Sequence, residues 1–167
     1  SSKSLTENIL QTNEVINYAK KRNVSVEAEI GSLQGSEDGE YTNLTYTTLD
    51  EATEFVLQTN VNTLAPAIGN VHGIYKNEPK LDFELLGAIC KAVKIPLVLH
   101  GASGLDDNKI KTAIFCGVAK ININTDLQIA WSNKVREYLE KEKDVYDPRK
   151  IIKAGENALK KVVHEKN

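Results

Sequence analysis

The sequence lacks several features that define large classes of protein. It has no methionine, two cysteines (Cys90 and Cys116) and only 6% aromatic residues among its 167 residues. Two cysteines are too few for a disulfide framework, and they do not form a zinc knuckle. No apolar run approaches the roughly 18 residues of a membrane-spanning helix, and no signal-peptide pattern opens the chain. We therefore expect a cytoplasmic protein without membrane contact.

An excess of charge of either sign is also missing. The 21 Lys+Arg residues nearly balance the 23 Asp+Glu residues, and the basic residues form no block. This distribution gives no electrostatic footprint for nucleic acid. The length and the 41% hydrophobic content suit one globular domain, 1–167. Because the chain has no methionine and starts with Ser1-Ser2, we expect further residues upstream of it.

Short apolar segments alternate with longer amphipathic segments along the whole chain. Capping boxes at Ser4 and Thr48 predict the starts of two helices. Predicted strands cover 24–30, 64–68, 96–100 and 118–123. Predicted helices cover about 4–22, 82–93, 106–114, 126–141 and 149–164, and a further helix is predicted to begin at Thr48. Strands that alternate with helices predict a parallel sheet with right-handed crossovers.

Polar side chains occupy one face of the predicted strands. Alternation places Glu27 with Glu29 in the first strand, Lys120 with Asn122 in the last, and His100 at the end of the third. A doubly wound sheet, covered by helices on both faces, does not accommodate this pattern. A flavodoxin-like domain would also need an acidic cluster at its first strand end. A (β/α)₈ barrel fits, because polar residues at the carboxyl ends of its strands form the active site.

Two histidines follow consecutive predicted strands, and each precedes a glycine. A single strand-end histidine is more often a hydrogen-bonded core residue than a ligand, but His72 and His100 together favour a metal site. Glu27 and Glu29 would supply oxygen ligands or support the histidines. Catalytic zinc usually takes three protein ligands and keeps one position open, and this sequence offers two convincing ones. His164, in a charged terminal helix, is interpreted as a surface residue.

Three loops at strand ends are candidates for binding substrate. Gly101-Ala-Ser-Gly104 and Asn122-Ile-Asn-Thr-Asp126 each lead into a helix and would present N–H groups and hydroxyls to an anion. Ordinary turns are the alternative interpretation of both. The acidic loop 31–39 is either a solvated surface loop or a mobile segment whose Glu37 carries a proton.

These motifs together resemble the class II, zinc-dependent fructose-1,6-bisphosphate and tagatose-bisphosphate aldolases. The resemblance extends over essentially the whole chain. It rests on Val26-Glu-Ala-Glu-Ile-Gly31 with Gly35-Ser-Glu-Asp38, Gly69-Asn-Val-His-Gly-Ile-Tyr75, Leu99-His-Gly-Ala-Ser-Gly104, Lys120-Ile-Asn-Ile-Asn-Thr-Asp126 and Tyr146-Asp-Pro-Arg149. It implies a parallel (β/α)₈ TIM barrel of which this chain is the second half, with strands 5 to 8.

The resemblance also implies roles for individual residues. His72 and His100 match two of the three zinc histidines, and Glu29 matches a carboxylate at a second or alternative divalent metal position. Glu37 matches the loop glutamate that moves a proton on dihydroxyacetone phosphate. The positions that bind this triose phosphate are matched by Gly73, Gly101, Ala102, Ser103, Asn122, Ile123, Asn124 and Thr125. A monovalent cation is expected near Gly73 and Gly101, whereas Lys120 is interpreted as electrostatic or packing support rather than a Schiff-base lysine.

A complete barrel needs roughly 250 residues, so the first half is missing. The missing half would contain the third zinc histidine and an aspartate that the family uses for proton transfer. A half-barrel leaves two unpaired parallel edges, so we expect the missing N-terminal half as a partner and an inactive fragment without it. Homodimers or homotetramers are expected from the family.

The sequence leaves the substrate open. Fructose 1,6-bisphosphate is favoured by its place in central metabolism and by the segments 64–69 and 146–149. Tagatose 1,6-bisphosphate, which differs at C4, is the alternative. A non-catalytic half-barrel that only binds a sugar phosphate is a further alternative from a different functional class.

Overall fold

The structure, a computed structural model, describes residues 1–37, 40–75 and 77–166, except for the side chains of residues 34, 36, 37 and 40–42. The chain forms two compact units, Ser1–Asn122 and Ile123–Asn167.

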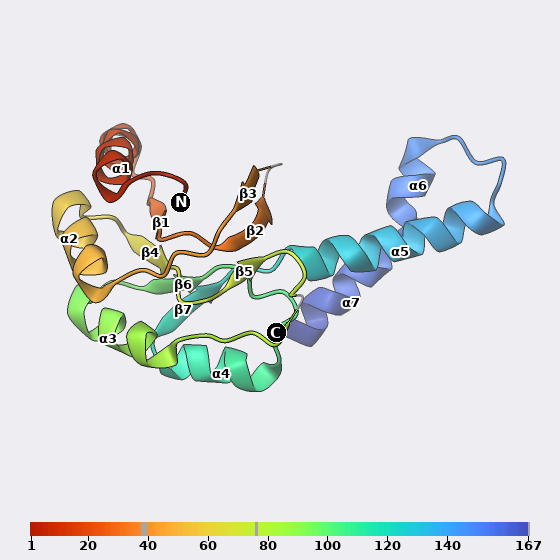
Figure 1. Ribbon diagram of the computed structural model, residues 1–167. Helices are drawn as coiled ribbons and strands as arrows, with labels where there is room; N and C mark the ends of the chain where they lie inside the picture. Colours follow the sequence, from red (N-terminus) through yellow and green to blue (C-terminus); the bar gives the residue numbers. More distant parts are fainter. Residues whose placement is uncertain (38–39, 76, 167) are drawn as a thin grey trace. The chain divides into compact units, whose positions relative to one another are not determined.

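The first unit is built on a four-stranded parallel sheet in the order β1-β4-β6-β7. Its strands are β1 (Glu27–Ile30), β4 (Thr63–Pro66), β6 (Leu97–Leu99) and β7 (Val118–Ile121). Helix α1 (Leu5–Lys20) precedes β1, and the crossovers contain α2 (Leu49–Thr59), α3 (Phe83–Val93) and α4 (Asp107–Phe115). These four helices form an arc outside the strands (Figure 1). This is the predicted second half of a (β/α)₈ barrel.

Local sequence signals explain where these helices begin. Both predicted capping boxes are present, with Ser4 before α1 and Thr48 before α2. Asp82 and Asp106 cap α3 and α4 by accepting hydrogen bonds from backbone N–H groups of the first turn. The core between helices and sheet is apolar and fully buried, with Phe55, Leu64, Ile89, Leu97 and Leu99 each at most 1% exposed.

The sheet is curved, and one side-chain contact demonstrates this. Glu27 on β1 and Lys120 on β7 lie on strands that are separated by β4 and β6. On a flat sheet the backbones of these two strands would be about 14 Å apart. The Glu27 carboxylate and the Lys120 ammonium group are nevertheless 2.7 Å apart. The polar faces of the strands therefore converge on a concave inner side, as in a barrel. Among the described residues, β1 and β7 each pair with one neighbour only.

A second, smaller sheet was not predicted. It has the order β3-β2-β5 and consists of β2 (Gln34–Glu37), β3 (Glu40–Thr42) and β5 (Val71–His72). Segment 31–39, predicted as a loop, thus contains a strand that pairs in parallel with β5, Gly35 lying opposite His72. A glycine is required there, because at φ +128° a Cβ on Gly35 would lie 2.1 Å from the His72 carbonyl oxygen.

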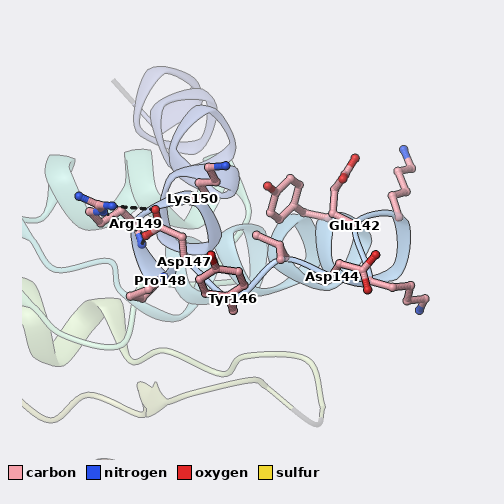
Figure 2. A pocket seen from close by; sticks show the side chains of 11 residues that line it. Glu142, Asp144, Tyr146, Asp147, Pro148, Arg149 and Lys150 are labelled. Carbon is pink, nitrogen blue, oxygen red and sulfur yellow. Dashed lines mark hydrogen bonds and ion pairs between the residues drawn. The ribbon is translucent and has the colours of Figure 1, made fainter.

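The second unit contains three helices where two were predicted: α5 (Thr125–Lys141), α6 (Pro148–Ala154) and α7 (Glu156–Lys166). The predicted helix 149–164 is interrupted at Gly155, which packs so closely on Trp131 that a Cβ would lie 2.1 Å from the indole ring. A hollow between α5 and α6 is lined only by residues 138–150 of this unit, among them Tyr146 and Arg149 (Figure 2).

None of the helices in the described part of the chain is long and apolar enough to cross a membrane.

Candidate metal centre

The two strand-end histidines come together with a glutamate at the carboxyl end of the curved sheet. Glu29, His72 and His100 each offer one ligand atom, and these three atoms lie within 4.8 Å of one another. The centroids of the two imidazole rings are 6.1 Å apart. Two imidazole nitrogens and one carboxylate oxygen are a donor set that zinc binds in catalytic sites, where three protein ligands leave one position open. The residues present therefore fit a zinc ion.

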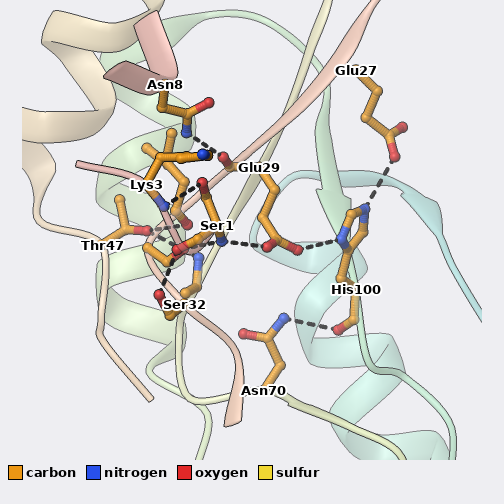
Figure 3. Close-up of polar contacts among 12 residues, drawn as sticks. Ser1, Lys3, Asn8, Glu27, Glu29, Ser32, Thr47, Asn70 and His100 are labelled. Carbon is orange, nitrogen blue, oxygen red and sulfur yellow. Dashed lines mark hydrogen bonds and ion pairs between the residues drawn. The ribbon is translucent and has the colours of Figure 1, made fainter. Parts of the chain in front are cut away.

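Carboxylates contact both nitrogens of the His100 ring (Figure 3). Nδ1 lies 2.7 Å from Glu29 Oε2, and Nε2 lies 3.1 Å from Glu27 Oε1. Burial disfavours the imidazolium, but the hydrogen bonds to Glu29 and Glu27 outweigh it and raise the pKa of His100. The ring is thus held from both sides by side chains of β1.

The two glutamates respond to the same contacts. Burial raises the pKa of Glu29, but the hydrogen bond with His100 opposes this effect, and the pKa lies below the ordinary value. Burial likewise opposes ionisation of Glu27, and hydrogen bonds from Lys120 and His100 bring its pKa below the ordinary value. Both side chains are therefore carboxylates at neutral pH, the form in which Glu29 can bind a metal.

The segments that carry His72 and His100 are joined by two further side chains. Asn70, fully buried, accepts from the Ile68 N–H at 2.9 Å and donates to the His100 carbonyl at 2.8 Å. The Tyr75 hydroxyl donates to the Gly101 carbonyl at 2.9 Å and accepts from the Val71 N–H at 3.1 Å. Burial raises the pKa of the Tyr75 phenol, so the hydroxyl keeps its proton and can donate.

Tyr75→Phe should destabilise the protein by about 1–2 kcal/mol, because it leaves a carbonyl and an N–H without this partner. Urea unfolding of the full-length protein measures the change. Tyr46→Phe is the matched control, since its exposed hydroxyl makes one long hydrogen bond of 3.4 Å to Lys80. It should change the free energy of unfolding by less than about 0.5 kcal/mol. Equal losses in the two variants would show that Tyr75 does not join the segments.

The predicted substrate residues of the first unit lie next to the histidines. Gly73 and Gly101 directly follow His72 and His100, and both have positive φ angles. Ala102 and Ser103 are buried at the end of this loop. The Ala102 N–H donates to the Asn122 carbonyl at 3.4 Å, which connects the loop to the end of β7. The Asn122 side chain lies 3.4 Å from Glu27.

The structure gives less information on the other predicted site residues. Glu37 is the last residue of β2, and its side chain lies outside the described part of the structure. Ile123, Asn124 and Thr125 belong to the second unit, where Thr125 begins α5 and Asn124 precedes it. Their roles in substrate binding stay predictions.

Two contacting residues, Asn70 and Tyr75, had no individual role in the sequence analysis, and a third, Lys120, had no assigned partner there. Asn70 and Tyr75 lie within one of the motifs used there, but only the folded chain shows that they reach the His100 segment. Lys120 was interpreted as electrostatic or packing support, and the structure shows an ion pair with Glu27. Side-chain alternation had placed Lys120 and Glu27 on the inner face of the sheet, and this was the sequence signal available for their contact.

Comparison with known proteins gives a consistent result. The family described as fructose-bisphosphate aldolase class-II matches residues 1–167. The 6-phospho-5-dehydro-2-deoxy-D-gluconate aldolase of Bacillus subtilis (strain 168) is 44% identical over 99% of this chain and 57% of its own length. The fructose-bisphosphate aldolase of Geobacillus stearothermophilus is 48% identical, over 94% of this chain and 55% of its own length.

A solved structure agrees with these relatives. The YdjI aldolase from Escherichia coli K12 aligns with a TM-score of 0.73 and 40% identity, covering 97% of this chain and 57% of its own. The chain thus spans about half the length of the relatives it matches, as the half-barrel sheet requires. On the match over its whole length, the chain belongs to the class II fructose-bisphosphate aldolase family.

Proposed function

We propose that the full-length protein containing this chain is a zinc-dependent aldolase that cleaves fructose 1,6-bisphosphate to dihydroxyacetone phosphate and glyceraldehyde 3-phosphate. The observation that carries the proposal is the convergence of Glu29, His72 and His100 within 4.8 Å in a chain of this family. The 48% identity to the Geobacillus stearothermophilus fructose-bisphosphate aldolase supports the choice of substrate.

The chemistry requires stabilisation of a carbanion equivalent. Cleavage breaks the bond between C3, the carbon next to the C2 ketone, and C4, whose hydroxyl loses its proton and becomes the aldehyde. The electron pair of that bond stays on the ketone fragment as the negative charge of an enediolate, which water stabilises poorly. Zinc held by His72, His100 and a third histidine outside this chain would supply Lewis-acid stabilisation of that charge. Glu29 lies beside both histidines and would orient them or bind metal at an alternative position. A second divalent metal, and a monovalent cation near Gly73 and Gly101, belong to the same proposal.

The remaining predicted residues would bind the substrate and move its proton. Backbone and side-chain groups at Gly73, Gly101–Ser103 and 122–125 would hold the phosphate of dihydroxyacetone phosphate and thereby orient its reacting carbon. Glu37 would add or remove the proton at that carbon. Lys120 is not needed as a Schiff-base nucleophile, and its Nζ is engaged by Glu27.

A second substrate is favoured by a specific observation, the 44% identity to the Bacillus subtilis enzyme named for 6-phospho-5-dehydro-2-deoxy-D-gluconate. Aldol cleavage of either compound, between the α and β carbons of its ketone, releases the same three-carbon ketone phosphate. The two differ in the aldehyde product, which carries a phosphate in one case and a carboxylate in the other. The residues of this chain that are predicted to bind dihydroxyacetone phosphate would therefore serve both reactions. They do not discriminate between the two substrates.

The test is an aldolase assay of zinc-loaded full-length protein on fructose 1,6-bisphosphate, tagatose 1,6-bisphosphate and 6-phospho-5-dehydro-2-deoxy-D-gluconate. We expect the highest kcat/KM with the fructose substrate. The isolated 167-residue chain should be inactive, because the third histidine and the aspartate are expected in the missing half. Zinc-loaded protein that cleaves none of the three would instead support a non-catalytic sugar-phosphate-binding protein.

A further inference from the structure

The His100 ring has two carboxylate neighbours that differ in their other contacts. Glu29, on the Nδ1 side, belongs to the group of three potential metal ligands. Glu27, on the Nε2 side, also accepts hydrogen bonds from Lys120 Nζ at 2.7 Å and Asn122 Nδ2 at 3.4 Å. Figure 3 shows the two carboxylates approaching the ring from opposite sides. The two edges of the imidazole therefore face different chemical environments.

Ionised carboxylates face both ring nitrogens, so each contact on its own favours a hydrogen on the nitrogen that it faces. A metal bound among Glu29, His72 and His100 would take the place of the hydrogen on Nδ1 and leave Nε2 as the nitrogen that carries one. An ionised carboxylate only accepts hydrogen bonds, so the 3.1 Å contact between Glu27 and Nε2 is favourable when Nε2 bears the hydrogen. A neutral imidazole with its hydrogen on Nε2 keeps a lone pair on Nδ1. Nδ1 is the nitrogen beside Glu29, on the side of the potential metal ligands. Glu27, which already receives donors from β7, is the poorer candidate for a metal ligand.

We propose that Lys120 and Glu27 form a positioning pair that holds His100 with its hydrogen on Nε2 and presents Nδ1 to the metal. Lys120 orients the Glu27 carboxylate, and the carboxylate orients the ring. This inference rests on the proposed function, because it assumes that His100 is a metal ligand. It assigns Lys120 and Glu27 a part in metal binding without direct contact with metal or substrate.

The alternative is that the ion pair only stabilises the fold. The Lys120 side chain is 55% exposed and that of Glu27 is 25% exposed, and ion pairs with an exposed partner contribute little to stability. Loss of a carboxylate that orients a ligand histidine, in contrast, typically weakens metal binding 10- to 100-fold. Metal affinity and unfolding therefore respond differently under the two explanations.

The first experiment measures zinc dissociation constants of the full-length protein by chelator competition. Glu27→Gln should weaken zinc binding about 10- to 100-fold and Lys120→Met about tenfold, whereas Lys120→Arg, which keeps a donor for Glu27, should stay within about threefold. Lys134→Met is the matched control, because Lys134 forms a 2.7 Å, half-exposed ion pair with Glu137 outside this cluster. Unchanged zinc affinity in Glu27→Gln and Lys120→Met would overturn the proposal.

The second experiment needs no variant and decides the question even if Glu27→Gln fails to fold. Two-bond ¹⁵N–¹H correlation spectra of histidine in the zinc-loaded protein report which ring nitrogen carries the hydrogen. We expect His100 to have its hydrogen on Nε2 and metal on Nδ1; the reverse arrangement would overturn the proposal. If the unaltered protein binds no zinc at all, the proposed function fails first. Zinc binding with the wrong His100 nitrogen refutes the positioning pair alone.

Discussion

Replacing His100 with alanine should remove zinc from the full-length protein and lower kcat/KM at least about 1000-fold. The loss follows from the several kcal/mol that a Lewis acid contributes to stabilising the transition state, since 1.36 kcal/mol corresponds to a factor of ten in rate. Zinc analysis and a coupled aldolase assay measure the two effects. His100 contacts Glu27 and Glu29 but is not fully buried, so the variant should fold.

His164→Ala is the matched control for this experiment. His164 is exposed in α7, and its replacement should leave zinc content and rate unchanged. A His100→Ala variant that retains stoichiometric zinc and full activity would show that His100 is not a metal ligand.

Gly101→Ala should destabilise the protein by about 2–5 kcal/mol and weaken zinc binding. Gly101 has φ +63°, where a side chain costs about 1–2 kcal/mol, and its Cβ would lie 2.2 Å from the Val71 carbonyl oxygen. The clashing atom belongs to the backbone, so relief requires the segments that carry His72 and His100 to separate. Such overpacking typically costs a further 1–3 kcal/mol. Urea unfolding and chelator competition provide the two measurements.

Gly87→Ala is the control for this substitution. Gly87 lies inside α3, and a Cβ there would meet no atom within 4 Å. Alanine favours the helix by up to about 1 kcal/mol, so this variant should be as stable as the original protein or more so. Equal stability of Gly101→Ala and Gly87→Ala would contradict the close approach of the two histidine segments.

The sequence predicted the inner face of the sheet because side-chain alternation is a local property. Glu27, Glu29 and His100 were expected on one face, and the structure confirms this through their mutual contacts. Capping boxes likewise predicted the starts of α1 and α2. Both signals depend only on residues that are close in the sequence, so they can be recognised without knowledge of the tertiary structure.

The features that were missed depend on contacts between distant residues. Pairing of β2 with β5 joins residues nearly forty positions apart, and nothing in the glycine-rich segment 31–39 specifies that partner. Gly155, where the predicted helix is interrupted, packs closely against Trp131. The hydrogen bond from Asn70 to the His100 carbonyl likewise exists only once two strand ends meet. The two strand-end histidines favoured a metal site from sequence, but their closeness to each other and to Glu29 is known only from the structure.

The most direct test of the metal centre is an anomalous difference map, recorded at the zinc edge, from crystals of the full-length protein grown with zinc. One peak should lie about 2.0–2.1 Å from ring nitrogens of both His72 and His100. Zinc bound elsewhere, with these two rings contacting only protein atoms, would contradict the account.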